Sequence, residues 1–121
     1  MDDLKLGIVE ERFAELIWQY EPLGSRELAR ICERELNWKR PTTYTVLRKL
    51  CEKGLFQNVN GTVSSVIARE EFYAMRGEKF VSETYGGSLP AFIAAFTARN
   101  KLSDEEADAI QKLIDEARRE D

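Results

Sequence analysis

One segment, from Trp38 to Leu55, constrains the fold of this chain more than any other. Its sequence, WKRPTTYTVLRKLCEKGL, has Pro41 near the start of a predicted helix and Gly54 at its end. Proline suits the first turn of a helix, and glycine favours the backbone conformation that ends one. At about 100° per residue, Val46 and Leu47 fall on an apolar side, and hydroxyl and cationic side chains fall opposite.

Two short strand patterns follow this helix almost at once, in the sequence FQNVNGTVSSVIA. We predict strands at Phe56–Val59 and Val63–Ala68, because Asn60-Gly61 between them is a strong hairpin signal. Two amphipathic helices precede the segment, one at about Val9–Tyr20 and one that starts near Ser25. Three helices followed by a hairpin predict a winged helix-turn-helix, a fold that places its third helix on DNA.

The first helix is expected to bury four residues at helical spacing, Phe13, Leu16, Ile17 and Tyr20. Ser25 is a predicted N-cap of the second helix, since its hydroxyl can accept a hydrogen bond from a free backbone N–H. Trp18 and Trp38 are interpreted as aromatic residues of the core or of its edge, and not as residues that stack on a ligand.

Three more helices are predicted beyond the hairpin: Arg69–Thr84, one in the stretch SLPAFIAAFTARN, and one that follows the capping box Ser103-x-x-Glu106. Short helices need a partner surface to be stable. The residues predicted for dimerisation are Leu89, Phe92, Ile93, Phe96, Ile110 and Ile114. The chain is therefore predicted to be mainly α with a small β-hairpin: a winged-helix DNA-binding domain at 1–70 and a helical dimerisation domain at 71–121.

Composition excludes several classes of function. The chain of 121 residues contains no histidine, so histidine-based acid–base catalysis is excluded. Two separated cysteines, Cys32 and Cys51, are too few for an ordinary zinc site and are interpreted as reduced, buried thiols.

No catalytic constellation or cofactor motif occurs, so no enzyme activity and no cofactor are expected. No apolar run approaches the roughly 18 residues of a membrane span, and a cytoplasmic protein without membrane insertion is expected.

The distribution of charge favours a nucleic-acid partner although the net charge is -4. Residues 38–58 contain five cations and one acid, whereas residues 71–121 contain 7 cations and 11 acids. Binding to a polyanion depends on the local field of one face and not on the charge of the whole protein. Double-stranded DNA is therefore the predicted partner of the basic segment.

The residues predicted to contact DNA are Lys39, Arg40, Thr42, Tyr44, Thr45, Arg48 and Lys49. Arg48 is the strongest candidate for a base contact, because a guanidinium can bond two acceptors of guanine at once. Thr42 and Thr45 can bond phosphate or meet a thymine methyl group, and Tyr44 can donate to phosphate. The sequence leaves open which of them touch bases.

Lys39 and Arg40 precede the helix and are expected to bind the phosphate backbone. The hairpin contains no lysine or arginine, so a contact from it would come from Asn58, Asn60, Thr62 or backbone amides. A hairpin that only covers the core remains an equal alternative.

Three stretches, IVEERFAELIW, TTYTVLRKLCEKGL and ETYGGSLPAFIAAFTARNKLSDEEADAIQKLI, together resemble the penicillinase-repressor family of bacteria. The resemblance runs nearly end to end. Its most specific parts are Trp18 at the end of the first helix, the pattern TxxTVLxxLxxKG, and Tyr85-Gly86-Gly87 followed by Phe96.

The resemblance implies a homodimeric winged-helix repressor that binds an inverted-repeat operator and is joined by its C-terminal helices. The positions that match the family's DNA-contacting helix are Thr42, Tyr44, Thr45 and Arg48. It also implies release by a regulatory protease linked to a membrane β-lactam sensor. The bond that matches the family's cleavage position is Ala95–Phe96.

Several positions depart from the family's pattern. Tyr44 stands where the best-known repressors carry arginine, and Ala95 stands where asparagine is expected. The hairpin lacks the usual basic residues, and the C-terminal cysteine motif of the copper-responsive branch is absent. Two alternatives therefore stay open: a winged-helix adaptor that binds proteins without binding DNA, and a regulator that responds to a small ligand.

Overall fold

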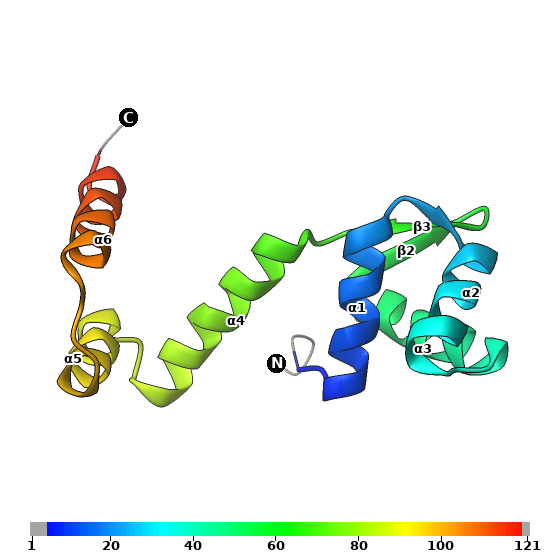
Figure 1. Ribbon diagram of the computed structural model, residues 1–121, viewed down its shortest axis with the longest axis horizontal. Helices are drawn as coiled ribbons and strands as arrows, with labels where there is room; N and C mark the ends of the chain where they lie inside the picture. Colours follow the sequence, from blue (N-terminus) through cyan, green and yellow to red (C-terminus); the bar gives the residue numbers. More distant parts are fainter. Residues whose placement is uncertain (1–4, 120–121) are drawn as a thin grey trace. The chain divides into compact units, whose positions relative to one another are not determined.

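The computed structural model describes residues 5–119, which form a mainly helical chain with a small antiparallel sheet (Figure 1). In chain order the elements are α1 (Ile8–Tyr20), β1 (Leu23–Gly24), α2 (Ser25–Leu36), α3 (Arg40–Glu52), β2 (Phe56–Val59), β3 (Thr62–Ser65), α4 (Arg69–Thr84), α5 (Leu89–Arg99) and α6 (Asp104–Ala117). The predicted fold class, a winged helix-turn-helix followed by further helices, is confirmed.

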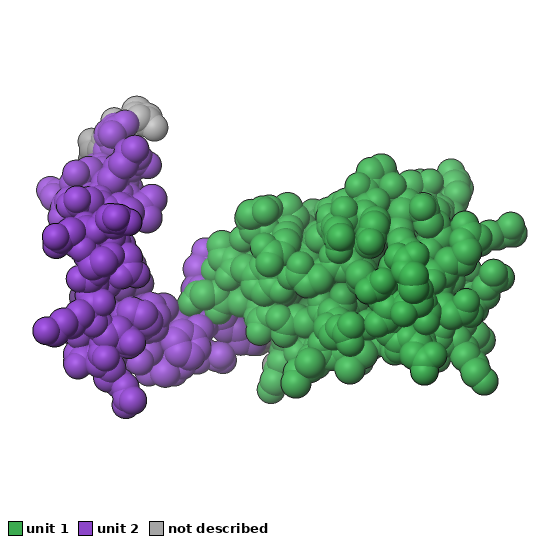
Figure 2. Space-filling view, viewed as in Figure 1, with its two compact units in different colours: residues 1–77 green, residues 78–121 purple. Residues whose placement is uncertain are grey.

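The chain divides into two compact units, which we call unit 1 (residues 1–77) and unit 2 (residues 78–121) (Figure 2). Helix α4 contributes residues to both units. The functional division at residue 70 that the sequence suggested stays a prediction.

The sheet has the strand order β1-β3-β2 and is antiparallel throughout. Asn60 (φ 52°) and Gly61 (φ 84°) form the tight turn between β2 and β3, as the hairpin signal predicts. Strand β3 ends at Ser65 and not at Ala68 as expected, because the backbone N–H groups of the next two residues turn to the carbonyl of Leu55. The short strand β1 was not predicted.

The core of unit 1 lies between the first three helices and the sheet. Its largest fully buried side chains include Phe13, Phe56, Phe72, Ile17, Leu28 and Leu50. Trp38 stacks against Phe13 with ring centroids 5.3 Å apart, and the indole N–H of Trp18 donates to the Ile67 carbonyl oxygen over 3.1 Å. Both tryptophans pack against the buried cluster, so their predicted place at the edge of the core is confirmed.

Two local predictions about the first two helices are wrong. Tyr20 is 40% exposed, because the next residue, Glu21, takes the position beside the sheet. The Glu21 carboxylate accepts hydrogen bonds from the Ser65 backbone N–H over 2.7 Å and from its hydroxyl over 3.0 Å. Ser25 is not the N-cap of α2: Gly24 is, and the Ser25 backbone N–H donates instead to the Gly61 carbonyl at the hairpin turn.

The first half of α4 is tied to α1 by two carboxylates. Glu15 accepts hydrogen bonds from the Arg69 guanidinium over 2.8 Å and from the Tyr73 hydroxyl over 2.6 Å. Glu11 pairs with Arg76 over 2.9 Å. We call these five residues the α1–α4 clamp; beside it, Phe72 of the same helix is fully buried.

The clamp perturbs the acid–base behaviour of its members. Partial burial raises the pKa of Glu15, but the hydrogen bonds from Arg69 and Tyr73 outweigh it and hold that pKa below its usual value. Burial together with the nearby Glu15 carboxylate raises the pKa of Tyr73 to about 12. Tyr73 therefore remains a neutral donor to the Glu15 carboxylate near neutral pH.

Unit 2 is organised around aromatic rings. Phe92 of α5 lies 5.9 Å from Phe80 and 5.4 Å from Tyr85 between ring centroids, and Phe96 lies 6.2 Å from Phe92. The Ser103 hydroxyl accepts from the Glu106 backbone N–H, and the Glu106 carboxylate accepts from that of Ser103, so the predicted capping box is confirmed. Within residues 5–119, no helix is long and apolar enough to cross a membrane.

Candidate nucleic-acid interface

Helix α3 separates its buried side from a polar exposed side. Thr43, Leu47 and Leu50 are buried against the core. Of the predicted contact residues, Tyr44 is half-buried, and the rest are exposed: Lys39, Arg40, Thr42, Thr45, Arg48 and Lys49. The structure thus brings all seven predicted residues together on or just before one helix.

The cations of this face differ in their surroundings. The Lys49 ammonium is paired with the Glu10 carboxylate of α1 over 2.9 Å, and the Lys53 ammonium donates to the Lys5 carbonyl oxygen over 3.1 Å. In the described part of the chain, Lys39, Arg40 and Arg48 form no ion pair. These three cations therefore have their charge available to a partner.

The pairing of Lys49 also affects Glu10. A hydrogen bond from the Gly7 backbone N–H, together with the Lys49 ammonium, lowers the pKa of Glu10. No pattern in the sequence indicated this pair, because Glu10 and Lys49 lie on different helices, and the local hydrogen bond of Glu10 to Gly7 says nothing of a partner on α3. The structure thus distinguishes Lys49 from the cations of α3 that are unpaired within the described residues.

The start of α3 is suited to an anion. Its first turn contains no acidic residue. Pro41 has no backbone N–H, and the Thr42 backbone N–H donates to the Lys39 carbonyl oxygen over 3.0 Å, so the attraction for an anion comes from the helix dipole and from side chains. Lys39, Arg40 and Thr42 lie at this end, so two cations and a hydroxyl coincide there with the positive end of the dipole.

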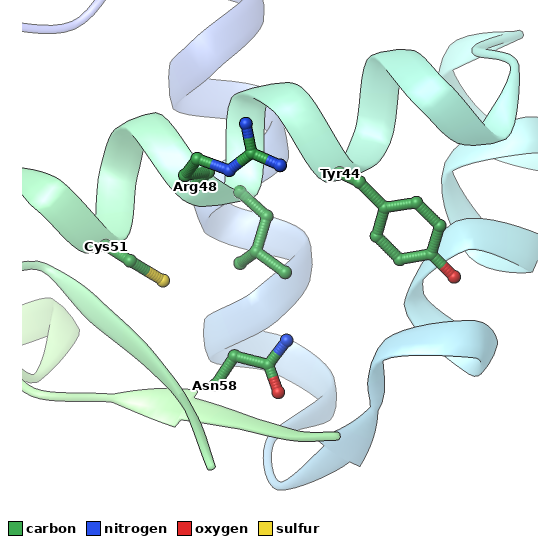
Figure 3. A pocket seen from close by; sticks show the side chains of 5 residues that line it. Tyr44, Arg48, Cys51 and Asn58 are labelled. Carbon is green, nitrogen blue, oxygen red and sulfur yellow. The ribbon is translucent and has the colours of Figure 1, made fainter. Parts of the chain in front are cut away.

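A pocket of about 390 Å³ lies between α3 and β2 (Figure 3). Its lining residues are Tyr44, Leu47, Arg48, Cys51 and Asn58. Tyr44, Arg48 and Cys51 come from α3, whereas Asn58 extends from β2 toward the helix. Polar groups from the helix and from the hairpin therefore border the same recess.

The pocket is relevant to the role of the hairpin, for which the sequence left two alternatives open: contact with DNA, or cover of the core alone. Val63 of β3 is fully buried, so the hairpin does cover the core. Asn58 is exposed and lines the pocket with Arg48, whereas Asn60 and Thr62 are not among its lining residues. Of the polar hairpin residues named from the sequence, Asn58 is the one that shares a surface with α3.

The cysteines are free, and Cys32 is buried as expected. Cys51 is only half-buried, because it faces the pocket and not the interior of the core. Burial raises the pKa of both thiols, that of Cys32 to about 11. Both are therefore held as protonated thiols near neutral pH.

The residues predicted for dimerisation lie on α5 and α6, neither of which has a buried residue. Phe92 is half-buried in the aromatic cluster; the other five predicted residues are exposed, namely Leu89, Ile93, Phe96, Ile110 and Ile114. Leu113, which was not among the predicted residues, is a further large apolar side chain on α6 and is 63% exposed. Its position three residues after Ile110 is the helical spacing that could have added it to the predicted set.

The Ala95–Phe96 bond lies within α5. The Phe96 carbonyl oxygen accepts hydrogen bonds from the Asn100 backbone N–H over 3.0 Å and from the Asn100 side-chain amide over 3.1 Å. The matched cleavage position is therefore part of a hydrogen-bonded helical turn.

Comparisons with known proteins agree with this geometry. Residues 6–116 match the family described as penicillinase repressor. The penicillinase repressor of Bacillus licheniformis is 23% identical over 116 residues, which cover 93% of this chain and 91% of that protein. Since the family match spans both units, the chain belongs to the penicillinase repressor family, whose members are DNA-binding transcriptional repressors.

Proposed function

We propose that this protein acts as a homodimer that represses transcription by occupying an inverted-repeat operator in the cytoplasm. Each copy presents α3 to the major groove of one half-site, and β2 approaches the adjoining backbone. The observation that carries this proposal is the exposed face of α3, where Arg48, Lys39 and Arg40 have no ion-pair partner in the described part of the chain.

The side chains on the exposed face of α3 fall into two groups, one suited to binding the phosphate backbone and one suited to contacting base edges. Lys39, Arg40 and Thr42 place two cations and a hydroxyl at the positive end of the helix dipole, a combination suited to a phosphate. Arg48 lies two turns further along and shares the pocket with Tyr44 and Asn58. A guanidinium flanked by a phenol and an amide offers several hydrogen bonds to base edges.

The apolar surface of unit 2 supports the dimer. Helices of 11 and 14 residues are marginal in water without a surface to pack against, and α5 and α6 bury none of their residues. Leu89, Phe96, Leu113 and Ile114 leave large apolar areas exposed. A second copy of the same surface covers these residues in a two-fold arrangement, as most soluble oligomers do.

A titration of the protein against DNA tests this function. Fluorescence anisotropy is measured with the intergenic DNA upstream of its own gene and with a scrambled duplex of equal length, at two salt concentrations. We expect the native duplex to bind about a thousandfold more tightly or better, with an affinity that falls as salt rises. Absence of any salt-sensitive binding would favour the protein–protein adaptor, and strong stabilisation by a metabolite would favour the ligand-responsive regulator.

Release from the operator is proposed to follow cleavage of the Ala95–Phe96 bond by a protease linked to a membrane sensor. Proteases bind their substrates in an extended conformation, so this turn of α5 must unwind first. Within one copy α5 has no buried residue, so the cost of unwinding comes mainly from contacts with the second copy. Mass spectrometry of the protein from β-lactam-treated cells should show a fragment that ends at Ala95. Intact protein in cells whose target genes are derepressed would contradict cleavage.

A further inference from the structure

Gly77 occupies the interior of α4, where a glycine is costly. The helix runs for 16 residues from Arg69 to Thr84. A glycine inside a helix lowers the equilibrium constant for forming the local helical turn about fivefold relative to alanine. The reason is that glycine loses more backbone freedom when the helix forms. Its presence in a helix that bridges two units therefore needs a reason.

Neither conformation nor packing requires a glycine at this position. The glycines with a left-handed backbone are Gly54, Gly61, Gly86 and Gly87, and Gly77 is not among them. Apart from the backbone of its own helix and its chain neighbours, a Cβ built on Gly77 would meet no atom of the chain within 4 Å, so packing within one copy does not exclude a side chain. What the glycine contributes is conformational freedom.

Gly77 also lies where the contacts of α4 change. The α1–α4 clamp ends at Arg76, whose guanidinium pairs with Glu11 over 2.9 Å and lies 5.6 Å from the centroid of the Phe72 ring. The boundary between the two compact units falls directly after Gly77. Beyond it, the Phe80 ring joins the aromatic cluster of unit 2, 5.9 Å from Phe92. Each half of α4 is thus held by its own unit, and Gly77 lies between the halves.

We propose that Gly77 is a hinge within α4 that determines which half-site spacings the repressor accepts. The inference rests on the proposed dimer and inverted repeat. One added base pair rotates a half-site by about 35° around the DNA axis and moves it along that axis. A dimer with stiff connecting helices matches one spacing, whereas bending at Gly77 lets the two α3 helices follow the change.

The hinge is tested first without DNA. In the intact protein, backbone amides of residues 77–82 should exchange hydrogen faster than those of residues 72–76, the first of which, Phe72, donates to the Ala68 carbonyl oxygen over 2.9 Å. Gly77→Ala should slow exchange in that segment about fivefold. Ser82→Ala, at an exposed position of the same helix, serves as the matched control and should slow it by about twofold at most. Equal exchange rates in the wild type and Gly77→Ala would overturn the hinge.

The second test uses inverted-repeat duplexes whose spacer is lengthened or shortened by one base pair. The wild type and Ser82→Ala should bind the three spacings within about threefold of one another, whereas Gly77→Ala should bind the altered spacings at least about tenfold more weakly. Gly77→Ala should keep full affinity for the best spacing. An unchanged spacing profile in Gly77→Ala would overturn the assignment of spacing to this residue. If neither the wild type nor the two variants prefer an inverted repeat to a single half-site, the proposed dimeric function is wrong. The hydrogen-exchange rates alone then show whether Gly77 is a hinge.

Discussion

Arg48→Ala should weaken binding to the native operator by about 1–3 kcal/mol and leave binding to unrelated duplex DNA nearly unchanged. Arg48 is exposed on α3, has no ion-pair partner in the described part of the chain, and lines the pocket between α3 and β2. Its loss removes a bidentate donor to base acceptors without disturbing the core. The measurement is a competition titration with operator and scrambled duplexes.

Lys49→Ala is the matched control, because it removes a cation from the neighbouring position of the same helix. The Lys49 ammonium is already paired with Glu10 over 2.9 Å, so its charge is partly neutralised. The Lys49 side chain is 58% exposed and the Glu10 side chain 20% exposed. Ion pairs at a protein surface contribute about 0–1 kcal/mol, and the variant should therefore remain folded. We expect Lys49→Ala to weaken operator and scrambled DNA alike and only slightly. Equal weakening of both duplexes by Arg48→Ala would make Arg48 a phosphate contact.

Phe96→Asp should convert the dimer into monomers, with an increase of the dissociation constant of at least about a hundredfold. Phe96 is 48% exposed, on a helix without a buried residue, and its ring centroid lies 6.2 Å from that of Phe92, so the substitution should leave the fold of the monomer intact. Placing an unpaired carboxylate in an apolar interface costs about 3–5 kcal/mol, and a two-fold dimer contains it twice. Sedimentation velocity over a range of concentrations measures the effect.

Two further substitutions in α5 distinguish an effect on the dimer interface from an effect on the fold of the monomer. Phe92→Asp should also abolish the dimer, but Phe92 packs on Phe80 and Tyr85, so this variant should lose helical content as well. Ala98→Asp introduces the same charge about 200° around α5 from Phe96 and should leave the dimer intact. A dimer that survives Phe96→Asp would place the interface elsewhere.

Local patterns were sufficient to predict most elements of the fold. The bounds of α4, the turn at Asn60-Gly61 and the capping box at Ser103 follow from signals that lie within a few residues. Strand β1 could not be predicted in this way, because two residues contain no alternation. Its existence depends on pairing with β3, which lies nearly 40 residues further along the chain.

The sequence was sufficient to predict which residues form the candidate site, but not which other residues they contact. The exposed face of α3 follows from helical periodicity, which places Thr45 and Arg48 away from the buried stripe of Thr43, Leu47 and Leu50. The pairing of Lys49 with Glu10 and the position of Asn58 beside Arg48 depend on how separate elements pack. No local motif encodes such contacts, so the sequence could not separate the free cations from the paired one.

The positions of the two tryptophans have a consequence for any optical study of this protein. Trp18 and Trp38 both belong to unit 1, and the sequence has no other tryptophan. Trp18 also contacts Phe72 and Tyr73 at the start of α4, with ring centroids 5.4 Å and 6.0 Å apart. Tryptophan emission is therefore a built-in probe of unit 1 and of the attachment of α4 to it. Melting of the C-terminal helices does not change the surroundings of either tryptophan directly and is better followed by circular dichroism.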